Sequence, residues 1–182
     1  MSARYTFNLE SRDGRHPLPH RINLGQNDTE TTAHVILKLM AYLLFCRERL
    51  QIEASLHLDD VPFIPDLVQL DYTLRPVFWV ECGECGVNKL RKLAVKLHEC
   101  EIWVVKRSLA DAGHLLRAMG KEELRRGRYQ LLALDPEMFD EMNGLLLPRN
   151  NVVWYQGTFA PGHLQMEFNG LWFDAPFEVL KY

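Results

Sequence analysis

Residues 77–105 decide the fold, and they have the sequence VFWVECGECGVNKLRKLAVKLHECEIWVV. The first six residues are almost all apolar, which is typical of a strand covered on both faces of a sheet. Gly83 and Gly86 end this strand, and residues 87–98 then repeat apolar side chains at helical spacing. Residues 102–105 form a short β-branched strand. The order strand, helix, strand predicts a right-handed crossover and a parallel pair of strands.

The same patterns extend in both directions along the chain. On the N-terminal side they predict a β-hairpin over 4–24 around Asp13-Gly14, a helix over 29–49 and a strand over 66–72. On the C-terminal side they predict a helix over 108–119, a strand over 129–134, a helix over 136–143 and three short strands at 152–155, 164–168 and 171–173. The expected fold is α/β, with a mixed central sheet flanked by helices. We expect a single domain over 1–182, with a core at about 29–143, the hairpin 4–24 and a β-meander over 150–178.

Composition limits the class of protein. The chain has 182 residues, 47% of them hydrophobic, and its formal net charge is 21 − 24 = −3, which is typical of a soluble globular protein and excludes a globally basic nucleic-acid binder. Residues 1–10 lack the apolar core of a signal peptide, and the apolar run 39–46 is less than half of the ~20 residues that span a bilayer. We therefore expect a cytoplasmic protein with no membrane segment and with reduced cysteines.

Two carboxylates are the first candidate site. Asp66 and Glu81 lie on consecutive predicted strands joined by a tight turn, so the two side chains can meet at one end of the sheet. Converging carboxylates repel each other unless a cation lies between them, and hard oxygen ligands suit Mg²⁺ or Mn²⁺. The alternative is structural: Asp66 forms a turn or cap, and Glu81 pairs with a nearby lysine.

A resemblance to a known family supports the metal interpretation. Five short segments carry it: TET at 29–31 leading into LKLMAYLLF, RERL at 47–50, WVECG at 79–83, LRKLA at 90–94 and WVVKRS at 103–108. In these segments and in the order of its elements, the chain resembles the bacterial YaeQ family, which has the fold of the PD-(D/E)XK nuclease superfamily. The resemblance implies a restriction-endonuclease-like core.

The resemblance also implies a ligand set. Glu30, Asp66 and Glu81 match the acidic positions of the superfamily motif, and the backbone carbonyl of Cys82 completes the metal ligands. The motif lysine belongs at position 83, where this chain has glycine. Lys89 and Lys92 on the following helix are the candidates to replace it. Two simpler interpretations stay open, in which Glu30 caps its helix together with Asn27 and the lysines form a solvated helix face.

Three functions follow from these observations. The first is a Mg²⁺- or Mn²⁺-dependent phosphodiesterase that uses Asp66, Glu81, Glu30 and Lys92 or Lys89. The second is a non-catalytic member of the same fold that binds nucleic acid or a protein; residues 88–128 carry 11 basic and 5 acidic residues, a local charge of +6. The third is a thiol redox or zinc module at Cys82 and Cys85, for which the chain offers no second pair of ligands with suitable spacing.

Overall fold

The computed structural model describes residues 3–56, 58 and 61–182. They form two compact units, each built from two separate segments of the chain. Unit 1 consists of Met1–Cys46 and Leu134–Glu178, and unit 2 consists of Arg47–Ala133 and Val179–Tyr182. The division does not test the prediction of a single domain, which stays a prediction.

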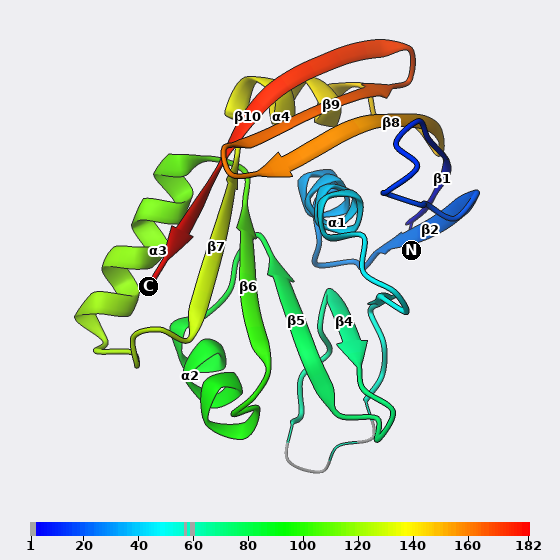
Figure 1. Cartoon of the computed structure of the whole chain (residues 1–182). Helices are drawn as coiled ribbons and strands as arrows, with labels where there is room; N and C mark the ends of the chain where they lie inside the picture. The colour runs from blue at the N-terminus through cyan, green and yellow to red at the C-terminus, as the bar shows by residue number, and fades with distance from the viewer. Residues whose placement is uncertain (1–2, 57, 59–60) are drawn as a thin grey trace. The chain divides into compact units, whose positions relative to one another are not determined.

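Unit 1 is a sheet with two helices (Figure 1). Its strands, in spatial order, are β2 (Arg21–Gln26), β1 (Ala3–Ser11), β8 (Arg149–Phe159), β9 (Gly162–Phe168) and β10 (Leu171–Lys181). Residues of β10 after Glu178 are counted with unit 2. The β1–β8 pair is parallel, and the β1–β2, β8–β9 and β9–β10 pairs are antiparallel. Helices α1 (Thr32–Phe45) and α4 (Pro136–Gly144) contact each other, and α1 also contacts β2. Fully buried side chains that include Phe7, Leu39, Trp154 and Phe168 form the core.

Unit 2 contains the strand, helix, strand segment predicted above. Its strands, in spatial order, are β7 (Tyr129–Leu134), β6 (Glu101–Lys106), β5 (Pro76–Cys82), β4 (Leu67–Leu70) and β3 (Gln51–Ile52). The β5–β6 and β6–β7 pairs are parallel, whereas β4 is antiparallel to both β5 and β3. Helices α2 (Val87–Lys96) and α3 (Leu109–Lys121) supply apolar side chains to a core shared with β4, β5, β6 and β7. The predicted parallel pair is therefore confirmed.

Most differences from the predicted elements concern their ends. Helix α1 begins after Thr31 and ends at Cys46, which has a left-handed backbone, so it is shorter than predicted. The predicted Asn27–Glu30 capping box does not cap this helix, because its N-cap is Thr31. The Glu30 carboxylate does accept from the Asn27 amide, but both residues lie before the helix starts. Strands β8 and β10 extend well beyond the predicted ranges, and the two-residue strand β3 was not predicted.

None of the helices that the described residues form is long and apolar enough to cross a membrane.

Candidate functional site

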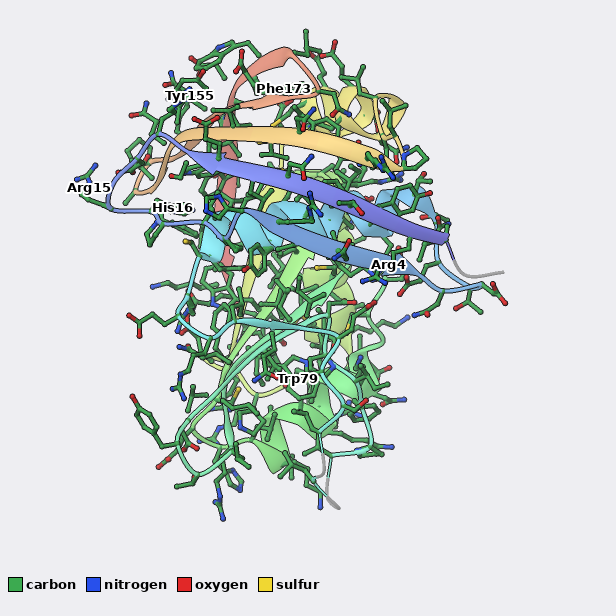
Figure 2. All side chains as sticks on the ribbon, turned by 90° about the vertical axis from the view of Figure 1, so that its right-hand side faces the viewer. Arg4, Arg15, His16, Trp79, Tyr155 and Phe173 are labelled. Carbon is green, nitrogen blue, oxygen red and sulfur yellow. The ribbon has the colours of Figure 1, made fainter. Side chains whose placement is uncertain are left out.

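The two predicted carboxylates lie side by side at one edge of the unit 2 sheet. In the antiparallel β4–β5 pair, Leu67 is opposite Val80, so Asp66 is opposite Glu81. Because side chains alternate along a strand, Asp66 and Glu81 lie on the same sheet face as Trp79, whose ring packs in the core under α2 and α3. Trp79 is labelled in Figure 2, among the side chains of unit 2. Asp66 is only 9% exposed and Glu81 only 5%.

Both carboxylates accept short hydrogen bonds. Asp66 Oδ2 accepts one from the backbone amide of Cys82, at 2.7 Å. Glu81 Oε1 accepts one from the Trp79 indole, and Glu81 Oε2 accepts one from Lys89 Nζ, both at 2.7 Å. Burial raises the pKa of Glu81; the Lys89 ammonium opposes this effect, and the negative charge of Asp66 adds to it. A cation beside Glu81 therefore stabilises its ionised form.

The carbonyl of Cys82 points to the same side of β5 as Asp66. The Gly83 amide donates to the Val105 carbonyl of β6 at 2.9 Å. In a trans peptide the carbonyl is opposite the N–H, so the Cys82 carbonyl points away from β6 and toward β4, where Asp66 lies. Two carboxylates and a carbonyl are hard oxygen donors, and this donor set fits Mg²⁺ or Mn²⁺.

Lys89 contacts one of these carboxylates, Glu81, whereas Lys92 is exposed to solvent. Lys89 approaches from the first turn of α2, and its Nζ also lies over the Phe63 ring, at 5.5 Å from the centroid. Lys92, one turn further along α2, is exposed, and no polar partner is found for it among the described residues. The solvated-face interpretation therefore describes Lys92 and does not describe Lys89.

Glu30 belongs to unit 1, where it has partners of its own. Its carboxylate accepts hydrogen bonds from Lys38 Nζ and from the Asn27 amide, both at 3.1 Å, and lies 3.5 Å from His34 Nε2. Lys38 is fully buried. A role for Glu30 as a third acid stays a prediction.

Sequence reasoning missed Lys106 at this edge of the sheet. Lys106 is the last residue of β6 and is only 5% exposed, and its Nζ donates to the Gly83 carbonyl at 2.6 Å. The signal in the sequence is a lysine in phase with Ile102 and Val104, the residues of β6 that face the core. This phase places Lys106 on the same face as Glu81.

The thiols do not resemble a redox centre. All four cysteines are free, and Cys82 is buried. Burial, together with the negative charge of Glu81, raises the pKa of Cys85 to about 12. A thiol with such a pKa is almost entirely protonated near neutral pH, so it is a poor nucleophile. The zinc alternative stays a prediction.

Much of the positive charge in residues 88–128 is used within unit 2. Arg91 pairs with Glu122, and Arg107 pairs with Asp111. Arg128 donates to the carbonyls of residues 97, 98 and 100. The local charge of +6 already counts the acids of these two ion pairs, and Lys92, Lys121 and Arg125 are exposed. Nucleic-acid binding by residues 88–128 stays a prediction.

Comparisons with known proteins identify the family. Residues 3–153 match the family model described as YaeQ protein. The fold is similar to that of the YaeQ protein from Xanthomonas axonopodis pv. citri, with 22% identity, a TM-score of 0.68, and coverage of 99% of this chain and 97% of the other. It is also similar to the YaeQ protein from Pseudomonas syringae, with 16% identity, a TM-score of 0.72, and coverage of 100% and 96%. No curated protein matches. The chain therefore belongs to the YaeQ family.

Proposed function

We propose that this protein is a metal-dependent phosphodiesterase with a PD-(D/E)XK-type centre formed by Asp66, Glu81 and Lys89. One observation carries the proposal: Lys89 Nζ lies 2.7 Å from Glu81 Oε2, next to Asp66 on the adjoining strand. An aspartate, a glutamate and a lysine at one edge of a sheet are the groups that such a centre requires. The lysine comes from the helix and not from the strand.

Each of the three residues has a part in this chemistry. When bound, Mg²⁺ or Mn²⁺ polarises a phosphodiester and lowers the pKa of a coordinated water. Asp66, Glu81 and the Cys82 carbonyl would hold the ion, and the two carboxylates would balance its charge. Lys89 supplies a positive charge and hydrogen-bond donors beside Glu81, where it can orient a water molecule or a phosphate oxygen.

Metal binding is the first test. Mn²⁺ is titrated into wild type, Asp66→Asn and Glu81→Gln, with Asp140→Asn as a control, because Asp140 is an exposed acid on α4. We expect a saturable site that both site variants weaken and the control leaves unchanged. Mn²⁺ binding that is equal in all four proteins would overturn the proposed centre.

Cleavage is the second test. Single- and double-stranded DNA and RNA are incubated with Mn²⁺ and wild type, Lys89→Met or Lys92→Met. We expect Lys89→Met to lose about 100-fold or more in rate, a typical effect of removing a positioned proton-transfer or water-orienting group, and Lys92→Met to retain activity. An equal loss in both variants would remove the special role of Lys89, and no cleavage by wild type would end the enzyme proposal.

A second candidate function is binding without catalysis. It is favoured by the contacts of Glu81, whose two oxygens already accept bonds from Trp79 and Lys89, so the carboxylate is satisfied as a structural group. In this case a fluorescent oligonucleotide binds without being cut, and its affinity falls as salt rises. Replacing exposed Lys92, Lys121 and Arg125 together is then expected to weaken binding more than Glu81→Gln does.

A further inference from the structure

We propose that Lys106 is a positioning residue that holds the turn after Glu81, so that the Cys82 carbonyl and Lys89 are presented to the site. The inference rests on the proposed function, because it assigns a task to a residue beside that centre. Among the described residues, Lys106 forms no hydrogen bond with Asp66 or Glu81. It therefore positions the site through its hydrogen bond to the Gly83 backbone.

The register of the sheet places Lys106 beside the proposed metal centre. In the parallel β5–β6 pair, Glu81 is opposite Val104 and Cys82 is opposite Val105. Lys106 therefore lies diagonally from Glu81 on the same face, next to the position where the motif lysine would stand. Asp66 directly precedes β4, Glu81 lies on β5 and Lys106 ends β6, so the three residues lie at the same end of adjacent strands.

Burial of Lys106 requires compensation from its surroundings. A lysine that is only 5% exposed is rare, because removing an ammonium from water is costly unless it is paired. The Gly83 carbonyl supplies a hydrogen bond at 2.6 Å. Asp66, Glu81, Lys89 and Lys106 all influence the pKa of the Cys85 thiol, so the Lys106 ammonium and both carboxylates act on the same neighbouring group.

The hydrogen bond fixes the chain where it changes direction. Gly83 has φ +73° and donates its amide to Val105 on β6 while its carbonyl accepts from Lys106. Both peptide groups of Gly83 are therefore held by β6. The preceding peptide carries the Cys82 carbonyl, and the following residues lead to the N-cap of α2 at Gly86, which has no side chain to cap the helix. Without Lys106, only the Gly83–Val105 hydrogen bond holds the peptide that carries the Cys82 carbonyl. The following peptide, which leads to α2 and to the approach of Lys89 to Glu81, then loses its constraint.

The experiment compares Lys106→Met with Lys181→Met, which removes an exposed lysine at the end of β10. Circular dichroism first shows whether each variant is folded. Lys106→Gln, whose neutral amide ends one bond short of the lysine Nζ, replaces Lys106→Met if that variant does not fold. Two quantities are then measured: the exchange rate of the Gly83 amide by NMR without metal, and Mn²⁺ affinity. We expect faster exchange at Gly83 and about 10- to 100-fold weaker Mn²⁺ binding in the Lys106 variant, as is usual for groups that orient metal ligands.

Two outcomes would overturn the inference, and a third separates it from the proposed function. Unchanged exchange at Gly83 shows that Lys106 does not hold the turn. Faster exchange with unchanged Mn²⁺ affinity in a folded variant shows that the turn does not position the ligands. If wild type itself binds no Mn²⁺, the metal centre fails, and Gly83 exchange still decides whether Lys106 holds the turn.

Discussion

Gly83 occupies the position where the family resemblance implies a lysine, and its backbone explains the departure. Its φ of +73° lies in the left-handed region, which costs a residue with a Cβ atom about 1 to 2 kcal/mol. A lysine at this position would strain the turn, whereas Lys89 reaches Glu81 from α2 without strain at that point. The sequence shows that the lysine is absent, but the reason lies in a backbone angle that the sequence does not display.

Substitution of Gly83 is the first prediction at this scale. We expect Gly83→Ala to lower the free energy of unfolding by about 1 kcal/mol or more, because alanine disfavours positive φ. Gly120→Ala is the control: Gly120 lies within α3, a Cβ atom there meets open space, and alanine favours helix by up to about 1 kcal/mol. Urea denaturation measures both. Equal effects of the two substitutions would contradict the strained-turn explanation.

The pairing of Lys89 with Glu81 gives the second prediction. The ammonium opposes the burial that raises the pKa of Glu81, so Lys89→Met removes the opposing charge and raises that pKa further. The Glu81 carboxyl resonance is followed by NMR as pH is varied in metal-free protein. Lys92→Met, which removes an exposed lysine from the same helix, serves as the control. A Glu81 titration that moves equally in both variants would show a general charge effect and no specific pair.

At the scale of elements, the periodicity of apolar residues predicted which segments form helices and strands. It predicted less well where these elements end and which strands pair with each other. The convergence of Asp66 and Glu81 followed from alternation along two adjacent strands, and the crossover predicted the parallel β5–β6 pair. Lys106 was missed because its contact with Gly83 depends on the register between β5 and β6. Likewise, residues 143 apart in sequence meet in the β1–β8 pair, and no local pattern indicates that pairing.

Asn150 of strand β8 is a buried amide that binds the chain on either side of the strand, at Leu147 and Asn169. Its fully buried amide donates to the Leu147 carbonyl at 2.6 Å and accepts from the Leu147 amide and from Asn169. Asn150→Ala leaves these buried groups without partners, so we expect a loss of about 2 to 3 kcal/mol in the free energy of unfolding. Asn151→Ala, at the next and exposed position of β8, is expected to cost much less. Similar losses in thermal or urea denaturation would contradict this role.

For the whole molecule, the net charge of −3 conceals an uneven distribution. Residues 88–128 carry +6, yet several of their arginines bind acids or carbonyls inside unit 2. Beside β5, Glu81 pairs with Lys89, and the buried Lys106 binds the Gly83 carbonyl. The net charge of the chain therefore excludes a globally basic nucleic-acid binder, but it does not locate a binding cleft. The reason is that the fold decides which charged side chains pair with each other and which remain exposed.

The stability of the whole chain should depend on pH through His16 in unit 1. Its Nε2 donates to the Leu43 carbonyl at 2.6 Å, and its ring stacks on Trp154, with 4.9 Å between centroids (Figure 2 labels His16). Burial lowers the pKa of His16 below its usual 6.5. The unfolded chain therefore binds this proton more readily, so the stabilisation is complete above pH 6.5 and is lost as pH falls toward the folded-state pKa.

His16→Gln isolates this effect. Wild type, His16→Gln and His20→Gln, which changes an exposed histidine of the same loop, are unfolded in urea at intervals between pH 8 and pH 5. Wild type and His20→Gln should lose stability below pH 6.5 by more than His16→Gln does, because only the first two retain a histidine that must stay neutral against Trp154. If the three curves stay parallel throughout this interval, His16 does not link proton uptake to unfolding. If His16→Gln instead loses more stability than wild type as pH falls, the charged imidazole is the form that the folded chain favours, and the helix C-terminus at Leu43 outweighs burial.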